Sequence, residues 1–425
     1  MRIFPSVLAA LALLTAGCSR AAKSVEPSYR GSTFLSTLSP KTTLDWTVAQ
    51  GGNGGIDGWL DGVDCVTETK CVAVGNESAS GGGSANALVE TWNGHAWSQV
   101  IAPLATAIPG DWLFSVSCAT AASCIAVGYY FSLKQSGSAS MLIETLAHGT
   151  WSVSPTPETG AGVADSFLNG VSCTSTTSCV AVGFTLSTKF VPRPLILALA
   201  GGSWSIMPSP SIGAGGLQAV SCPKRHSCVA VGYRASGSTD KPLVESLSGG
   251  KWGTTPTAGS GPTGLVHAGL GAVSCLTAAS CVAVGRLKGP VPAIEVRTNQ
   301  GWPIMKSPDP DSNDVATGLY GVSCTDTTSC VAVGDLAAAP SASARNTPDG
   351  AFASPLDPLI ETSSRGTWTI ASPPGLSPGG GLHAVSCSGR TCVAVGQSAE
   401  AGRIKTLIVQ SVSTGASSIA PGHGR

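Results

Sequence analysis

The sequence predicts an all-β fold assembled from seven repeated units, each made of four antiparallel strands. Close copies of the segment 171–183, VSCTSTTSCVAVG, recur seven times and start 49 to 63 residues apart. Glycine (54) and proline (28) are abundant, and no segment keeps a 3.6-residue apolar period, so strands joined by turns are expected. A repeat of this length is typical of stacked supersecondary units that cannot bury their apolar faces alone.

The N-terminal residues 1–17 are predicted to be an export signal. A basic start is followed by an apolar run through Leu14, which is too short to cross a membrane. The small residues before Cys18 resemble the bacterial lipobox, in which the cysteine is lipidated and becomes the mature N-terminus. Thr15 stands where that pattern has leucine, so plain secretion remains the alternative.

The segment 18–44 is predicted to be the lipidated cysteine and a flexible tether, because it is rich in Ser, Thr, Ala and Pro and shows no alternation that would bury a face. The repeated domain is expected over residues 45–413. Residues 414–425 are expected to form a tail.

Each unit contains four strand-like runs, which we name strands a, b, c and d. In the third unit they cover 168–173, 179–182, 195–199 and a run that begins at Trp204. The d strands carry a tryptophan, but only six such strands follow the seven cysteine pairs. Trp46 supplies the seventh if the run 44–48 pairs with the last c strand, 407–410. This pairing would close the ring and leave no sheet edge open.

This closure resembles the strand exchange found in many β-propellers. The cysteine-pair repeat is similar to a bacterial secreted propeller group related in form to BNR, kelch and WD40 repeats. The resemblance implies a seven-bladed β-propeller with four antiparallel strands per blade, closed by the N-terminal strand in the last blade. It implies no substrate.

Fifteen cysteines are accounted for by Cys18 and seven pairs, and export makes disulfides chemically permitted. Each pair is predicted to close the a-b hairpin of its blade. Metal–thiolate binding is disfavoured, because zinc sites use closer pairs joined to a second pair or to histidines. The predicted disulfides join Cys65 with Cys71, Cys118 with Cys124, Cys173 with Cys179, Cys222 with Cys228, Cys275 with Cys281, Cys324 with Cys330, and Cys387 with Cys392.

Residues that recur in every blade are most simply scaffold, so function is sought where the blades differ. The c-strand glutamates recur in five blades and are therefore interpreted as structural. The b-c and d-a loops, which emerge on one face, diverge most. Blades 1 to 3 carry an aspartate and an aromatic residue just before the fixed leucine of strand a, where blades 4 to 7 carry glycine at the aromatic position. These residues are Asp57, Trp59, Asp111, Trp112, Asp165 and Phe167.

An aromatic face beside a carboxylate suits a sugar ring, whose C–H face stacks while its hydroxyls donate to the carboxylate, and it also suits a cation. The alternative is that the aromatic residues fill gaps between blades and the aspartates cap turns. One residue after the fixed leucine, a variable ring is expected at the mouth of the central channel, either for binding or for packing. It consists of Asp61, Phe114, Asn169, Gln218, Gly271, Tyr320 and His383.

No metal or cofactor is expected. The weak calcium candidate Asp309, Asp311 and Asn313 has alternating oxygen ligands, but it lacks the glycine and the glutamate of a calcium-binding loop.

The net charge is zero and 11% of the residues are charged, which argues against binding to nucleic acid. Membrane contact is expected through the lipid anchor only, and the protein is expected to be a monomer. We interpret the chain as a lipid-anchored extracytoplasmic binding or scaffold protein whose loop face binds a glycan or a protein of the envelope.

Two alternative functions remain. One is a glycan-active hydrolase or lyase that uses the aspartates 57, 61, 111 and 165. The other is a purely structural envelope protein.

Overall fold

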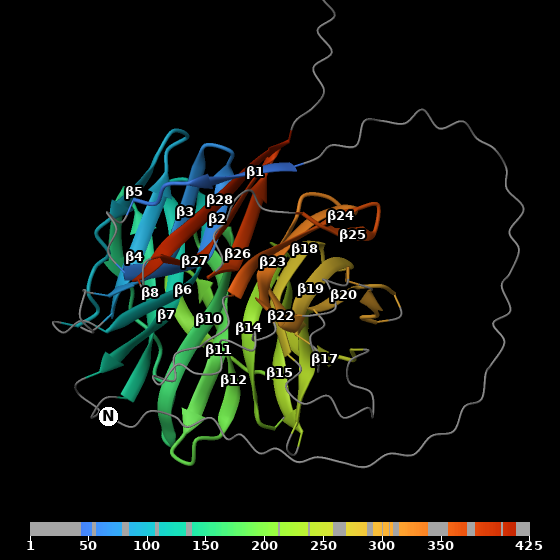
Figure 1. Cartoon of the computed structure of the whole chain (residues 1–425). Coiled ribbons are helices and arrows are strands. Elements are labelled where there is room, and N and C mark those ends of the chain that lie inside the picture. Colours follow the sequence, from blue (N-terminus) through green and yellow to red (C-terminus); the bar gives the residue numbers. More distant parts are fainter. Residues whose placement is uncertain are drawn as a thin grey trace, which may run out of the picture. The chain divides into compact units, whose positions relative to one another are not determined.

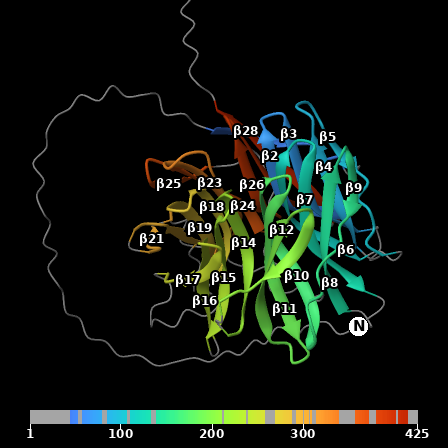
Figure 2. The same ribbon diagram turned by 180° about the vertical axis from the view of Figure 1, so that it is seen from behind.

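The computed structural model describes residues 44–52, 57–78, 85–106, 110–132, 138–210, 213–236, 239–257, 269–286, 292–299, 301–305, 307–308, 314–338, 356–371, 379–400 and 403–413. The described strands form seven four-stranded antiparallel sheets that pack side by side in a ring (Figure 1, Figure 2). The inner strands line a central channel. The predicted seven-bladed propeller is therefore confirmed.

Each blade runs from an inner strand a to an outer strand d. Blade 1 holds β2 (Asp57–Thr67), β3 (Lys70–Ser78), β4 (Ala85–Trp92) and β5 (Trp97–Val100). Blade 2 holds β6 (Asp111–Thr120), β7 (Ser123–Ser132), β8 (Ser138–Ala147) and β9 (Thr150–Val153). Blade 3 holds β10 (Val163–Ser175), β11 (Ser178–Ser187), β12 (Pro192–Ala200) and β13 (Ser203–Met207). Blade 4 holds β14 (Gly215–Lys224), β15 (Ser227–Ser236), β16 (Thr239–Ser248) and β17 (Lys251–Thr255).

Blade 5 holds β18 (Gly269–Thr277), β19 (Ser280–Arg286), β20 (Pro292–Val296) and β21 (Ile304–Met305). Blade 6 holds β22 (Asp314–Cys324), β23 (Ser329–Ala338), β24 (Leu356–Ser364) and β25 (Thr367–Ile370). Blade 7 holds β26 (Gly380–Ser388), β27 (Thr391–Glu400), β28 (Arg403–Ser413) and, as its outer strand, β1 (Leu44–Ala49). One detail differs from expectation: Trp302 lies just before β21, in an isolated bridge with Thr257.

The predicted closure of the ring is confirmed by the pairing of β1 with β28, in which Trp46 lies opposite Ser411. Trp46 is buried with residues of blades 6 and 7, including Val333 and Leu382. The expectation that no sheet edge stays open is wrong, because the outer strand of every blade is the last in its sheet. These edges are short, from two residues in β21 to six in β1, which limits pairing with other chains.

All seven predicted disulfides are confirmed, and each joins strand a to strand b of one blade. The bonded pairs are Cys65 with Cys71, Cys118 with Cys124, Cys173 with Cys179, Cys222 with Cys228, Cys275 with Cys281, Cys324 with Cys330, and Cys387 with Cys392. The second cysteine of every pair lies on strand b and is buried. These buried cysteines are Cys71, Cys124, Cys179, Cys228, Cys281, Cys330 and Cys392. They pack into the apolar clusters between blades, so the sulfur atoms also contribute to the core.

The Val-Ala-Val segment of strand b is buried between neighbouring blades, as Ala181 and Val182 illustrate. The glycine that follows it is required by a close approach of strand a. A Cβ on Gly183 would lie 2.0 Å from the carbonyl oxygen of Phe167.

The residue before the first cysteine of each blade links the blades into a ring of hydrogen bonds that the sequence analysis did not predict. Its side chain accepts the backbone N–H of the first cysteine in the next blade, as when Ser172 accepts the bond from Cys222 at 3.0 Å. Asp64 replaces serine in blade 1 and accepts the N–H of Cys118 at 2.6 Å. Burial raises the pKa of Asp64 to about 6. The remaining acceptors are Ser117, Ser221, Ser274, Ser323 and Ser386.

The c-strand glutamates are fully buried, which agrees with their interpretation as structural. Two of them receive hydrogen bonds from serines that follow the preceding blade: Ser209 donates to Glu245 at 3.1 Å and Ser307 donates to Glu361 at 2.9 Å. Burial raises the pKa of both glutamates to about 7. The others are Glu90, Glu144 and Glu295.

The predicted export signal, Cys18, most of the tether, the tail 414–425 and the calcium candidate Asp309, Asp311 and Asn313 lie outside the described residues and stay predictions. Within the described ranges, no helix is long and apolar enough to span a bilayer.

Candidate functional site

One end of the ring carries the b-c and d-a connections, and we call it the loop face. The opposite end carries the a-b hairpins with their disulfides and the c-d turns, because successive strands of each blade are antiparallel. Every described phenylalanine and tyrosine lies in the middle or the loop-face part of strand a or b, or in the loop that follows. These residues are Phe114, Tyr129, Tyr130, Phe131, Phe167, Phe184, Phe190, Tyr233 and Tyr320.

The aromatic residues of blades 1 to 3 form a continuous row, which we call the aromatic belt: Trp59, Trp112, Tyr129, Phe167 and Phe184. The ring centroids of Trp59 and Trp112 are 5.6 Å apart, and Trp112 stacks on Tyr129 at 5.9 Å. Tyr129 meets Phe167 edge-on at 5.0 Å, and Phe167 stacks on Phe184 at 4.8 Å. All five are half-buried, so they pack against one another and still present surface to solvent.

Tyr129 and Phe184 were not predicted from the sequence, although a signal for them exists. Each follows the glycine that ends the apolar run of strand b, Ile-Ala-Val-Gly before Tyr129 and Val-Ala-Val-Gly before Phe184, and this position varies between blades and pairs with the aromatic position of strand a. Phe190 extends the aromatic surface at the tip of the b-c loop of blade 3. It is 72% exposed and has a φ of 56°, an uncommon conformation for a bulky residue.

The three aspartates of blades 1 to 3 bind to other parts of the protein. Asp57 forms an ion pair with Nε of Arg403 at 2.9 Å, and Asp165 accepts the N–H of Ala139 at 2.8 Å. Asp111 is fully buried and accepts the N–H of Ala105 at 2.6 Å, and burial raises its pKa. Asp111 therefore does not present its carboxylate to the loop face, in contrast to the expected surface position.

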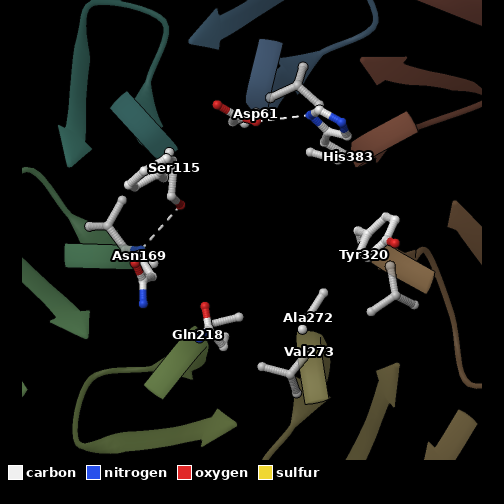
Figure 3. A pocket seen from close by; sticks show the side chains of 18 of the residues that line it. Asp61, Ser115, Asn169, Gln218, Ala272, Val273, Tyr320 and His383 are labelled. Carbon is white, nitrogen blue, oxygen red and sulfur yellow. Dashed lines mark hydrogen bonds and ion pairs between the residues drawn. The ribbon is translucent and has the colours of Figure 1, made fainter. Parts of the chain in front are cut away.

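The variable ring lies at the central channel, as expected, and lines a cavity of about 460 Å³ (Figure 3). Nδ1 of His383 lies 2.9 Å from Oδ1 of Asp61. The hydroxyl of Tyr320 donates to Asp335 at 3.0 Å, and the Tyr320 ring meets His383 edge-on at 6.5 Å. Burial and the neighbouring Asp335 carboxylate raise the pKa of Tyr320 to about 12.

Asn169 and Gln218 lie across the channel from Tyr320 (Figure 3). Nδ2 of Asn169 donates to the carbonyl of Leu217 at 2.9 Å. Deeper in the channel, seven valines form an apolar ring: Val63, Val116, Val171, Val220, Val273, Val322 and Val385. Hydrogen-bonding side chains are thus concentrated at the mouth.

Among the described residues, no group of three or more His, Cys, Asp or Glu side chains could hold a metal ion. The calcium candidate lies outside the described residues.

No family model matches this sequence, and no curated protein matches it. Solved structures are similar to it. The structure described as YCF48 bound to D1 peptide has a TM-score of 0.51 at 13% identity, over 89% of this chain and 97% of that chain. A Trypanosoma rangeli sialidase in complex with sialic acid has a TM-score of 0.46 at 8% identity, over 85% of this chain and 56% of that chain. Chaetomium thermophilum Sqt1 has a TM-score of 0.46 at 12% identity, over 85% of this chain and 97% of that chain.

Proposed function

We propose that this chain is an extracytoplasmic binding protein that holds a glycan on its loop face. The aromatic belt carries this proposal. Five contacting rings on adjacent blades offer a continuous apolar strip, and the C–H faces of sugar rings can stack on individual rings of such a strip. Polar side chains at the channel mouth lie beside it and can bind hydroxyl groups.

The placement outside the cytoplasm is supported by the disulfides. Seven disulfides in one chain are typical of an oxidising compartment. We propose further that Cys18 carries a lipid anchor. Leu44 pairs with Ser413 at the end of the ring opposite the loop face, so the described part of the chain begins at that end.

A glycan hydrolase or lyase is less well supported, because the candidate acids are already engaged within the protein. Asp111 is buried, and Asp57 and Asp61 are paired with Arg403 and His383. A peptide is the second candidate ligand, since the similar structure named YCF48 is described as bound to a D1 peptide. A structural envelope protein without a ligand is the third.

The test is a binding screen of purified residues 19–425 against a glycan array and isolated cell-wall polymers. Wild type is compared with Trp112→Ala and with Trp92→Ala, a half-buried tryptophan of β4 away from the loop face. We expect binding that Trp112→Ala weakens at least tenfold while Trp92→Ala does not.

Thermal unfolding of each variant separates loss of binding from loss of fold. If neither the array nor the polymers bind, the glycan proposal fails, and a peptide array becomes the next screen. If Trp112→Ala unfolds the protein, the belt is packing, and the structural alternative gains.

A further inference from the structure

We infer that the channel mouth binds the end of a glycan chain, with one neutral terminal sugar inside the variable ring and the following units on the aromatic belt. This inference rests on the proposed function and specifies which part of the glycan is recognised. The cavity of about 460 Å³ falls within the range of small-ligand pockets, roughly 300 to 1,000 Å³.

The shape of the mouth selects a chain end. Side chains or backbone from all seven blades line the cavity, so it is enclosed on every side and open along the channel axis (Figure 3). A ligand must therefore enter along that axis. A chain end can do so, whereas an internal segment would have to fold back on itself to pass in and out of the same opening.

The charges at the mouth favour a neutral ligand over an anionic one. The carboxylate of Asp61 is paired with His383, and the carboxylate of Asp335 accepts the hydroxyl of Tyr320. Burial raises the pKa of Asp335, and Tyr320, His383 and Arg286 act in the opposite direction with smaller effects. These hydrogen bonds leave the negative charge on the carboxylates, which disfavours an anionic ligand relative to a polyhydroxylated neutral one. Oδ2 of Asp61 has no partner among the described residues and can accept a hydroxyl.

Hydrogen-bonding atoms remain available around the ring. Gln218 forms no side-chain hydrogen bond with the described residues. Nδ2 of Asn169 donates to the Leu217 carbonyl, which leaves the amide oxygen of Asn169 available to a ligand. Nδ1 of His383 contacts Asp61, which leaves Nε2 available to a ligand. These groups lie on opposite sides of the channel, so hydroxyls on several edges of one sugar can be satisfied together (Figure 3).

The mouth is continuous with the belt. Phe114 lines the cavity, and its ring centroid is 5.7 Å from that of Tyr129, the central residue of the belt. Below the polar ring, the seven valines offer no hydrogen bond, so a polar ligand is retained at the mouth rather than drawn through the channel. One sugar in the mouth therefore places the next units over blades 2 and 3.

The experiment uses oligosaccharides displayed in two ways, attached either through the reducing end or through the non-reducing end. Wild type, Gln218→Ala and Asn169→Ala are compared with Gln50→Ala, an exposed glutamine outside the channel. We expect binding in only one of the two displays, a loss of at least tenfold in both mouth variants and no change in Gln50→Ala. Thermal unfolding confirms that the variants are folded.

Equal binding in both displays, with mouth variants unchanged and Trp112→Ala defective, would overturn the chain-end inference and leave the proposed function standing. Absence of binding in either display, with wild type folded, would overturn both.

Discussion

The repeat pattern does not explain the environment of the Glu144 carboxyl group. Glu144 recurs in register with other c-strand glutamates, yet neither carboxylate oxygen has a hydrogen-bond partner in the described residues. Burial, with the neighbouring Asp111 carboxylate, raises the pKa of Glu144 to about 8. Because this folded-state value exceeds 4.5, the carboxyl group stabilises the fold fully below pH 4.5, and the contribution is lost as the pH rises toward 8.

We expect Glu144→Gln to stabilise the protein at pH 8 by about 1 to 3 kcal/mol and to have little effect at pH 4.5. The amide has the same shape and carries no charge. Urea unfolding at the two pH values measures the difference, and exposed Glu158→Gln serves as the control. The same shift at both pH values would show that ionisation of Glu144 is not responsible.

Gly183 gives a second prediction at the residue scale. Gly183→Ala should cost about 2 kcal/mol or more, because its new Cβ would overlap the Phe167 carbonyl, which the strand pairing holds in place. Gly253→Ala is the matched control, since nothing lies within 4 Å of its Cβ position. The free energies of unfolding of the two variants should differ clearly, and equal values would mean that strand a can move aside.

At the scale of the strand, much could be predicted from the sequence. The seven cysteine pairs predict the a-b hairpins. Trp46, which supplies the d-strand tryptophan that the last repeat lacks, predicts the closure of the ring. Both predictions depend on a repeat that can be followed along the chain. The strands themselves are longer than expected: the run predicted at 179–182 belongs to β11 (Ser178–Ser187). Hydrogen bonding between neighbouring strands extends the regular structure beyond the apolar segment from which each strand was predicted.

Contacts between blades could not be predicted in the same way. The bond from Cys222 to Ser172 depends on how two separate sheets are packed, which no local pattern states.

Three of the five residues of the aromatic belt were predicted. Trp59, Trp112 and Phe167 were found by comparing repeats, and Tyr129 and Phe184 would have been found by extending the comparison to strand b.

The inter-blade ring leads to a prediction for Ser172→Ala. Loss of the acceptor leaves the N–H of Cys222 without its partner, so we expect the free energy of unfolding to fall by about 1 to 3 kcal/mol. Ser205→Ala, on the exposed surface of β13, should change it by less than about 0.5 kcal/mol. Chemical denaturation compares the two, and an equally small effect would mean that water replaces the serine.

At the scale of the whole molecule, closure by β1 is expected to keep the protein monomeric. Deletion of residues 44–50 would expose β28, an 11-residue strand, as an edge much longer than the outer strands of the other blades. We expect oligomers or aggregates in size-exclusion chromatography with light scattering. Deletion of residues 19–40, which retains β1, should leave a monomer, and a monomeric 44–50 deletion would show that closure is dispensable.

If the loop face binds a glycan through the aromatic belt, the affinity for that glycan depends on Trp112. The most direct measurement is isothermal titration of an array-selected oligosaccharide into wild type, Trp112→Ala and Trp92→Ala at a pH where all three are folded. We expect Trp112→Ala to lose at least tenfold in affinity, about 1.4 kcal/mol, and Trp92→Ala to match wild type. Unchanged affinity in Trp112→Ala would contradict this expectation and move the ligand away from the belt.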